Sequence, residues 1–242
     1  MKEGTFWRGS AILVFAVGGV LITAAAISLC TPWIGLVDLR EVVITGNRHA
    51  AAADLVSLSG LQRGQSLLVT SLRRVSANLL RHPWIKSVFL QRSLPHTLVI
   101  QVQEREEVAW MSSPSSEGCL TLGEGGVIVS TDCSGSASMI ELRGARLSGD
   151  GAGAVLLDEE LVGLIDALRR GALASLGARL IDLTHAGSVE LRTGTGLRVL
   201  LGDMDEMLLR LDSLAALSRS LDVEDYEVID LRFGGEATLV PR

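Results

Sequence analysis

The chain has 242 residues, 48% of them hydrophobic and 4% aromatic, a composition that predicts a folded protein of one large or two modest domains. The net charge of −6 is uneven, because residues 1–104 carry ten Lys/Arg against five Asp/Glu, whereas residues 105–242 carry twelve against twenty-three. Since phosphates would repel the acidic half, the charge argues against nucleic-acid binding by the whole chain. The basic half is either an ordinary solvated surface or lies close to anionic lipid headgroups.

The first distinct segment is an uncharged apolar run of twenty residues, 11–30. As a helix it would span about 30 Å, the thickness of a bilayer's hydrocarbon core. We expect a single transmembrane helix over residues 11–31, with residues 1–10 in the cytoplasm because Lys2 and Arg8 precede the run, and the remainder outside it. A cleaved signal peptide is the alternative, since three successive alanines resemble a cleavage site, but the run is longer than the usual core of about 7–15 residues.

Residues 37–105 predict a small domain in which the hydrophobic period changes between strand and helix. Alternating apolar residues bounded by turn residues indicate strands, and apolar residues at helical spacing after Ser71 indicate a helix that Pro83 ends. The expected elements are a strand at 37–45, helices at 49–59 and 71–82, and strands at 85–92 and 97–104. Their order is β-α-α-β-β.

This order resembles a POTRA domain, a small polypeptide-binding module found outside bacterial inner membranes. The residues narrow the resemblance to the bacterial division protein family FtsQ/DivIB, whose pattern is a helix, PW[VI], a strand, a proline turn, a second strand and ER-x-PVA. The matching positions are Pro83, Trp84, Ile85, Val88, Arg92, Pro95, Leu98, Ile100, Glu104, Arg105, Val108 and Ala109. Glu107 departs from the pattern, where the family usually has proline, which weakens the hinge expected between domains. We expect Pro83 and Trp84 to lock the preceding helix onto the sheet.

Residues 106–242 predict a second, β-rich domain with at least two helices, which makes the chain α+β. A GEGG turn between two short strands indicates a hairpin, and Asp203-x-x-Glu206 has the spacing of a capping box before a leucine-rich helix. The expected elements are strands at 119–122, 127–130, 180–183, 189–192, 197–201, 226–233 and 237–240, and helices at 156–171 and from 203 onward.

This second half resembles the FtsQ β-domain. Leu201-Gly202 before a leucine-rich helix is typical of that domain, and Asp230, Leu231 and Arg232 followed by Phe233 are similar to the family's DLRY/F strand. The resemblance therefore covers residues 10–240.

No constellation typical of an active site is evident, so we expect neither enzymatic activity nor a cofactor. The four histidines are scattered, and no metal site is expected because zinc needs three or four converging donors. Cys119 and Cys133 are candidates for a disulfide in an oxidising compartment, where the bond would contribute about 3 kcal/mol to stability. The alternative is that both pack as small core residues.

The resemblance implies a single-pass cell inner-membrane protein of division, with its C-terminal domains in the periplasm, that acts as a scaffold. Its implied partners are FtsB- and FtsL-like coiled-coil proteins and septal synthase components, through which it would regulate septal peptidoglycan synthesis. Two alternatives stay open: a POTRA-containing periplasmic protein of export or outer-membrane assembly, and a membrane-anchored periplasmic enzyme. The first would normally be followed by a barrel, whose long alternating strands are not evident, and the second would need a convergent polar site.

The last strand is the expected partner-binding surface. Residues 237–240 are short, β-prone and last, so they should lie at a sheet edge, where unpaired N–H and C=O groups invite a partner strand. The family places its FtsB contact on this strand and the aromatic before it, which here correspond to Phe233, Gly235, Glu236, Ala237, Thr238 and Leu239. The alternative is a closing strand whose edge the chain itself covers.

Overall fold

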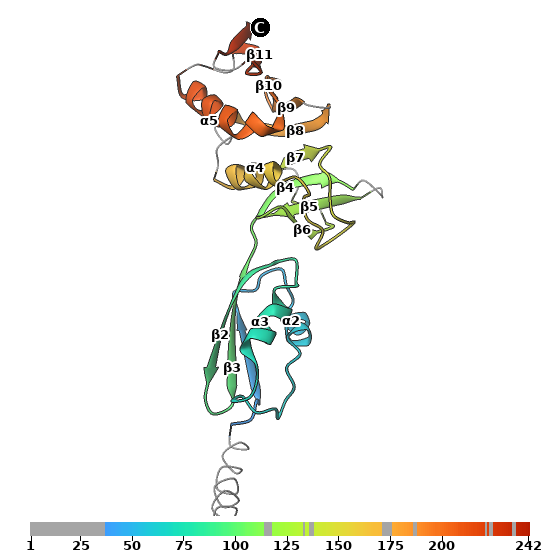
Figure 1. Cartoon of the computed structure of the whole chain (residues 1–242), viewed down its shortest axis with the longest axis vertical. Helices are drawn as coiled ribbons and strands as arrows, with labels where there is room; N and C mark the ends of the chain where they lie inside the picture. Colours follow the sequence, from blue (N-terminus) through green and yellow to red (C-terminus); the bar gives the residue numbers. More distant parts are fainter. Residues whose placement is uncertain are drawn as a thin grey trace, which may run out of the picture. The chain divides into compact units, whose positions relative to one another are not determined.

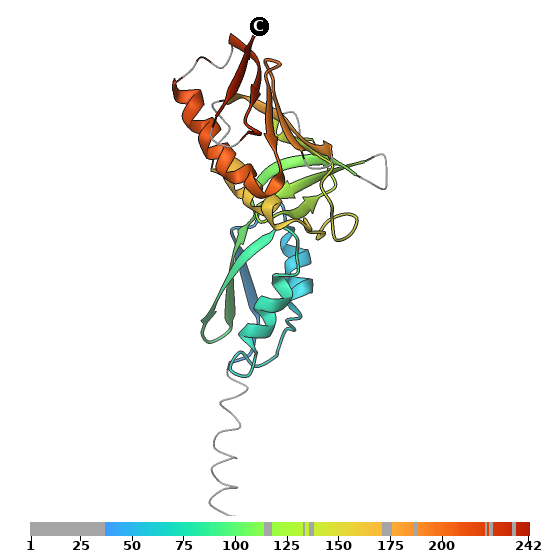
Figure 2. The ribbon, with the colours of Figure 1, turned by 45° about the horizontal axis from the view of Figure 1, so that its top comes forward.

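The computed structural model describes residues 37–113, 118–132, 134–135, 138–170, 176–185, 188–220, 222, 225–233 and 236–242. They form two compact units, which Figures 1 and 2 show in two views. The first contains the described chain up to Leu79 together with Ser87–Val102, and the second contains Leu80–Lys86 and Gln103–Arg242. The membrane helix expected at 11–31 lies outside the described residues, and among the described helices none is long and apolar enough to cross a membrane.

The first unit is a three-stranded sheet with two helices on one face (Figure 1). The strand order is β1-β3-β2, and β1 runs parallel to β3. The elements are β1 (Glu41–Thr45), α2 (Ala52–Ser59), α3 (Leu72–Leu79), β2 (Ile85–Ser93) and β3 (Thr97–Glu104). The predicted β-α-α-β-β order is therefore confirmed.

Alternation along β3 builds the core of the first unit. Leu98, Ile100 and Val102 are buried, while the residues between them are exposed or half-buried. Val75 and Leu79 of α3 are buried four residues apart, as the helical spacing predicts.

The first strand begins later than expected because the chain before it pairs with a loop. Val37 accepts a hydrogen bond from the backbone N–H of Leu67 at 2.9 Å, and Leu39 donates to the Gln65 carbonyl at 2.8 Å. Hydrogen bonding of this chain to the β3 side of the sheet therefore begins only at Arg40, whose N–H donates to the His96 carbonyl.

The second unit is a nine-stranded mixed sheet in the order β12-β11-β10-β9-β8-β7-β4-β5-β6, with α4 and α5 packed against it (Figure 2). The strands are β4 (Glu107–Ser112), β5 (Cys119–Gly123), β6 (Val127–Ser130), β7 (Ile140–Arg143), β8 (Ala178–His185), β9 (Ser188–Thr193), β10 (Arg198–Gly202), β11 (Tyr226–Asp230) and β12 (Thr238–Pro241), and the helices are α4 (Glu159–Arg169) and α5 (Met204–Ser220). The β-rich character and both helices agree with the sequence.

Two features of this sheet differ from the predictions. Strand β7 was not expected, because four residues carry little periodicity, yet it lies between β4 and β8 and pairs in parallel with both. Strand β11 ends at Asp230 rather than at residue 233. The Leu231 N–H still donates to the Leu200 carbonyl at 2.9 Å, so the next residue remains tied to β10.

The strand registers align one apolar residue from each of six neighbouring strands, which we call the apolar row. Its members are Leu142, Ile181, Leu191, Val199, Ile229 and Leu239. The first five are at most 1% exposed and share a hydrophobic cluster with the buried leucines of α4 and α5, and Leu239 packs against the same cluster. The helices therefore cover the face of the sheet that carries this row.

Two glycines of the first unit provide a matched test of backbone packing. Gly46 and Gly64 both have positive φ, at 87° and 82°, which strains any other residue. A Cβ at Gly46 would lie 2.1 Å from the Val102 carbonyl oxygen of β3, whereas a Cβ at Gly64 would meet nothing within 4 Å. We expect Gly64→Ala to lower the free energy of unfolding by about 1 kcal/mol and Gly46→Ala by about 3 kcal/mol or more.

The measurement is urea denaturation with amide hydrogen exchange reporting on β1 and β3. Equal destabilisation by the two variants would contradict the close approach of Gly46 to β3.

Candidate functional site

The two edge strands of the nine-stranded sheet, β6 and β12, differ in whether another segment of the described chain covers them. At one edge, the segment 153–156 covers β6: Ile128 donates to the Ala154 carbonyl and Gly153 donates to the Ile128 carbonyl, each at 2.8 Å. At the other edge β12 has β11 on one side, and in the part of the chain that the structure describes no strand lies on its other side. The predicted edge position of the last strand is therefore confirmed.

Backbone groups of β12 alternate between β11 and the open edge. The Arg242 N–H donates to the Asp225 carbonyl at 3.1 Å, so it points toward β11. Because N–H directions alternate along a strand, the N–H groups of Val240 and Thr238 face β11 as well. The N–H and C=O groups of Leu239 then face the open edge.

An apolar groove of about 620 Å³ lies beside this edge, between α5 and the chain that leads into β12. The residues that line it include Leu209, Ser213, Ala216, Leu217, Leu231 and Ala237. Leu209 is 72% exposed, whereas Leu211 and Leu214 of the same helix are buried in the core. We call this hollow the α5 groove. It was not predicted, because the sequence shows the leucine but not which element lies across from it.

The DLRF stretch forms one end of the site. The Arg232 guanidinium binds the Asp230 carboxylate through Nε at 3.0 Å and Nη2 at 2.6 Å, and the Arg232 N–H donates to the same carboxylate. The guanidinium lies 5.5 Å from the centre of the Phe233 ring, within cation–π range, and that ring is 67% exposed. Arg232 thus pairs with Asp230 and also lies near a large apolar side chain that is exposed close to the edge strand.

Arg210 joins α5 to this end of the site. Its guanidinium donates to the Leu201 carbonyl, to Glu206 and, at 3.3 Å, to the Arg232 carbonyl. Gly202 has a positive φ of 74°, and a Cβ there would lie 2.5 Å from Arg210 Nη1. The Leu201-Gly202 pair thus leaves room for an arginine that ties the helix to the DLRF stretch.

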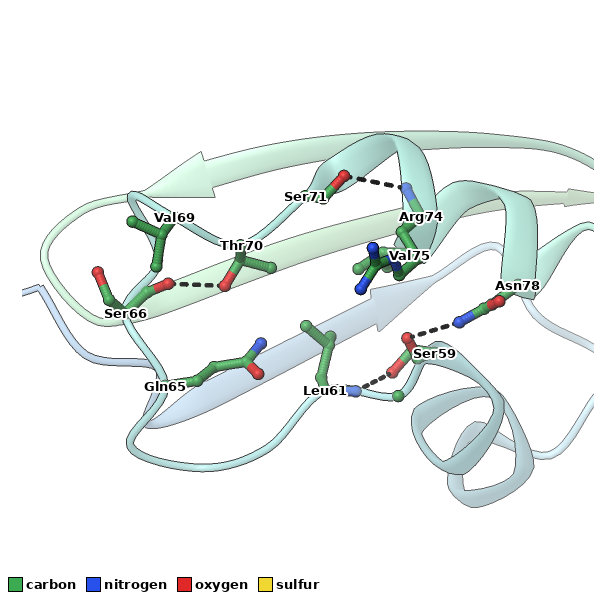
Figure 3. Close-up of a pocket in the computed structure, with 11 residues that line it drawn as sticks. Ser59, Leu61, Gln65, Ser66, Val69, Thr70, Ser71, Arg74, Val75 and Asn78 are labelled. Carbon is green, nitrogen blue, oxygen red and sulfur yellow. Dashed lines mark hydrogen bonds between the residues drawn. The ribbon is translucent and has the colours of Figure 1, made fainter.

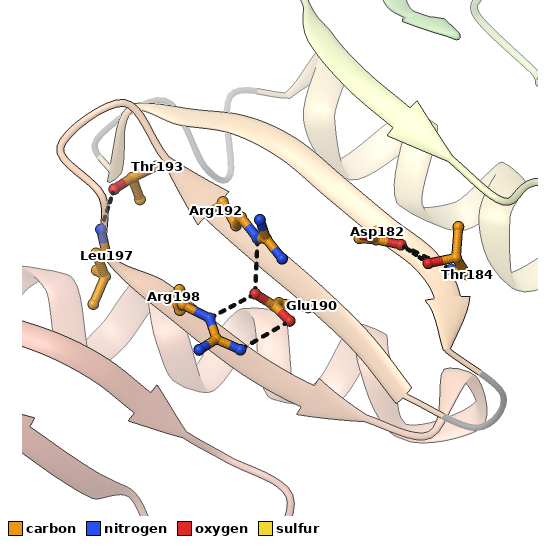
Figure 4. A network of polar contacts seen from close by, with 7 residues as sticks. All are labelled: Asp182, Thr184, Glu190, Arg192, Thr193, Leu197 and Arg198. Carbon is orange, nitrogen blue, oxygen red and sulfur yellow. Dashed lines mark hydrogen bonds and ion pairs between the residues drawn. The ribbon is translucent and has the colours of Figure 1, made fainter. Parts of the chain in front are cut away.

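The face of the sheet opposite the apolar row carries paired charges (Figure 4). Glu190 accepts from Nε of both Arg192 and Arg198 at 2.8 Å, and its side chain is only 9% exposed. Hydrogen bonds from Arg198 and then Arg192 lower the pKa of Glu190 below its ordinary value of 4.5. Arg232 likewise lowers the pKa of Asp230. Both carboxylates are therefore held in the charged form.

The predicted partner-binding residues mostly lie together. Phe233, Glu236 and Thr238 are exposed, and Ala237 and Leu239 are half-buried against the core cluster. Gly235 lies outside the described residues.

The motif residues near residue 83 belong to the second unit and contact one another there. The Arg105 N–H donates to the Trp84 carbonyl at 2.8 Å, and its guanidinium donates to the carbonyls of Pro83 at 3.2 Å and Glu124 at 2.9 Å. The half-buried Pro83 and Trp84 are thereby tied to Arg105 through their backbone carbonyls, and the expected lock of the preceding helix onto the sheet stays a prediction. Glu104 is half-buried, and Pro95 lies exposed in the β2–β3 turn after a cis peptide bond.

The first unit has a separate, polar groove of about 450 Å³ (Figure 3). Its walls are α3, the end of α2 and the loop between them. Asn78 donates to the Ser59 carbonyl across it, and Thr70 Oγ1 donates to the Ser66 carbonyl at 2.7 Å. The buried Ser66 Oγ has no hydrogen-bond partner.

Cys119 is disulfide-bonded in the structure. Cys133 lies outside the described residues, so the pairing of the two stays a prediction. Thr121 Oγ1 donates to the Asp132 carbonyl at 2.8 Å, which brings the chain just before Cys133 alongside β5. Among the described residues there is also no group of three or more His, Cys, Asp or Glu side chains that could hold a metal ion.

Comparison with known proteins agrees with this geometry. A family model described as "POTRA domain, FtsQ-type" matches residues 37–105. The chain is 22% identical to the cell division protein FtsQ of Corynebacterium glutamicum over 55% of its length and 59% of that protein, and 27% identical to FtsQ of a Geobacter species over 66% and 63%. It is 22% identical to the cell division protein DivIB of Clostridium acetobutylicum over 82% of the chain and 80% of that protein.

Residues 37–105 belong to the FtsQ-type POTRA family, and the chain as a whole is similar to FtsQ and DivIB division proteins. The FtsQ-type match covers the part that contains Pro83, Trp84, Pro95, Glu104 and Arg105, and the longer alignments extend into the β-rich unit. The chain spans about 60% of the length of the first two FtsQ relatives.

The lowered pKa of Glu190 makes a prediction about pH. A carboxylate whose pKa is lower when folded stabilises the fold fully above its unfolded value, near 4.5, and loses that contribution as the pH falls through the folded value. We expect Glu190→Gln to lower the free energy of unfolding at neutral pH by about 1 kcal/mol, because three charge-assisted hydrogen bonds from two partly exposed arginines are weakened or lost. The variant should also lose stability less steeply than the native chain below pH 4.5.

Urea denaturation at a series of pH values measures both quantities. If the native chain and Glu190→Gln lose stability in parallel below pH 4.5, the Glu190 network does not contribute as described.

Proposed function

We propose that the protein is an FtsQ-type scaffold of the cell-division machinery that binds an extended segment of a partner protein along β12. The observation that carries the proposal is the contrast between the two sheet edges, since β6 is covered by residues 153–156, whereas within the described ranges only β11 pairs with β12. Open edges are normally protected, so an edge left available in a folded domain favours strand addition. The relatives' designation as cell division proteins supports the biological setting.

The register gives the mode of binding. An added strand would hydrogen-bond to the N–H and C=O of Leu239. The partner residue that pairs with Leu239 would place its side chain at the end of the apolar row, on the face of the sheet that α5 covers. On that face the α5 groove offers an apolar surface. The partner residues immediately before and after that one would point to the opposite face of the sheet, beside the side chains of Thr238 and Val240. Backbone pairing would provide affinity, and the α5 groove would select an apolar residue at one position.

The partners proposed are FtsB- and FtsL-like membrane proteins of the divisome, and through them the septal peptidoglycan synthase. The protein would act by binding and positioning these partners rather than by catalysis. Phe233, held by Arg232, would contact the partner at the end of the added strand.

We also propose that residues 11–31 anchor the protein in the inner membrane, with residues 1–10 in the cytoplasm and both units in the periplasm. The uncharged run and the positions of Lys2 and Arg8 support this topology. A disulfide at Cys119 fits an oxidising compartment.

Two variants at Leu239 test the strand addition. Leu239→Pro removes the outward N–H together with much of the side-chain packing, whereas Leu239→Ala removes packing but keeps the N–H. We expect Leu239→Pro to bind an FtsB-like periplasmic segment at least tenfold more weakly than Leu239→Ala does, because a backbone hydrogen bond is lost and the proline ring obstructs the edge. Isothermal titration calorimetry measures the affinities, and circular dichroism checks that both variants are folded. Equal affinities of two folded variants would refute pairing at β12.

Reporter fusions at Arg242 test the topology. We expect a C-terminal alkaline phosphatase, which is active only outside the cytoplasm, to be active, and a C-terminal green fluorescent protein exported unfolded to stay dark. The reverse pattern in living cells would overturn the proposed anchor and the periplasmic location.

A further inference from the structure

Three exposed apolar side chains gather at one end of the first unit. Leu68 is 53% exposed and Val69 is 77% exposed in the loop before α3, and Leu94 is 58% exposed in the β2–β3 turn. Apolar side chains at such exposure are ordinary when single, but a group on two neighbouring loops indicates a contact surface.

Hydrogen bonds tie both loops to the start of the described chain. Arg92 donates to the carbonyls of Leu67 and Thr70, each at 2.7 Å, which joins the end of β2 to the loop. Leu67 donates to the Val37 carbonyl, and Arg40 donates to the His96 carbonyl at 2.9 Å. We call this end, formed by residues 37–40, 61–71 and 92–97, the proximal end. Figure 3 shows Val69 and Ser66 there, on the side where β2 ends and β1 and β3 begin.

The charge of the proximal end is mainly positive. Arg40, with 63% of its side chain exposed, and the exposed Arg63 belong to it, and two further arginines follow at the start of α3. Asp38 pairs with Arg40 at 3.2 Å and with His96 at 2.8 Å, which offsets part of the charge of Arg40. The excess positive charge therefore rests mainly on Arg63 and on the two arginines at the start of α3. The proximal end therefore presents both positive charges and exposed apolar side chains to any anionic surface that binds there.

The length of the preceding chain limits where this end can lie. Only residues 31–36 separate the uncharged run from Val37. Even fully extended, such a tether reaches at most about 25 Å. A domain held this close to a bilayer presents its proximal end to the headgroups, where apolar tips flanked by arginines are stabilised.

We propose that the proximal end of the first unit docks on the membrane surface, with Leu68, Val69 and Leu94 among the lipids and Arg40 and Arg63 at anionic headgroups. The proposal rests on the membrane anchor proposed above. The occupant is a lipid bilayer rather than a protein because the tether brings a bilayer within reach whenever the anchor is inserted.

Spin labelling of the full chain in vesicles of phosphatidylethanolamine and phosphatidylglycerol tests the docking. Labels are placed at Val69→Cys and Leu94→Cys in a chain that carries Cys30→Ser, without reductant so that the Cys119 disulfide persists. The matched control is Ala53→Cys, an exposed residue at the start of α2, which follows the opposite end of β1. The chain without an added cysteine gives the background.

At residues 69 and 94 we expect collisions with oxygen to exceed those with a polar nickel chelate severalfold relative to residue 53, because oxygen concentrates in lipid. In vesicles of phosphatidylcholine alone this preference should fall, since the arginines lose their anionic partners. If the preference for oxygen over the chelate is the same in phosphatidylcholine vesicles, Arg40 and Arg63 do not bind anionic headgroups as proposed.

Three other outcomes distinguish failure of the membrane docking from failure of the membrane anchor. If the chain is firmly inserted but residues 69 and 53 meet the chelate equally, the docking is wrong and the anchor stands. If residue 69 is shielded from both reagents, a protein surface covers the proximal end instead of lipid. If the chain is removed from the vesicles by alkaline washing, the anchor itself fails, and the docking fails with it.

Discussion

A slip of one residue in any central strand of the nine-stranded sheet would turn its member of the apolar row toward water, and the second unit depends on this constraint. Five of the six row residues are at most 1% exposed, so the register is specified by burial at each strand in turn. The same alternation sends Glu190, Arg192 and Arg198 to the opposite face, where they pair with one another. The charged network is thus a consequence of the register that the core requires.

The register also decides what the open edge can recognise. Leu239 is the last member of the apolar row, and it is only half-buried because no further strand is present on its outer side among the described residues. The α5 groove lies on the same side of the sheet, next to an exposed Leu209. Together, the edge strand β12 and the α5 groove form a site into which one further strand could fit, pairing with β12 and packing against α5.

Arginines hold irregular parts of the second unit in place. The Arg105 guanidinium binds the carbonyls of Pro83 and Glu124, and the Arg210 guanidinium binds those of Leu201 and Arg232. A guanidinium carries five donors in a planar fork, so one side chain can satisfy carbonyls from segments that are distant in the sequence. Arg105 of the ER motif thereby joins Pro83 to Glu124, whereas Arg232 of the DLRF stretch pairs with Asp230 and lies near the exposed Phe233 ring.

The sequence by itself determined the β-α-α-β-β order of the first unit, the two helices of the second and the position of the last strand at an edge. The element order and the helices depend on local period and on turn residues, and the edge position was expected because the strand is short and last in the chain. Only the tertiary structure decided the parallel pairing of β7 with β4 and β8, the covering of β6 by residues 153–156 and the α5 groove beside β12. Each of these joins segments far apart in the chain, and their pairing is selected by burial of the common core rather than by any local pattern.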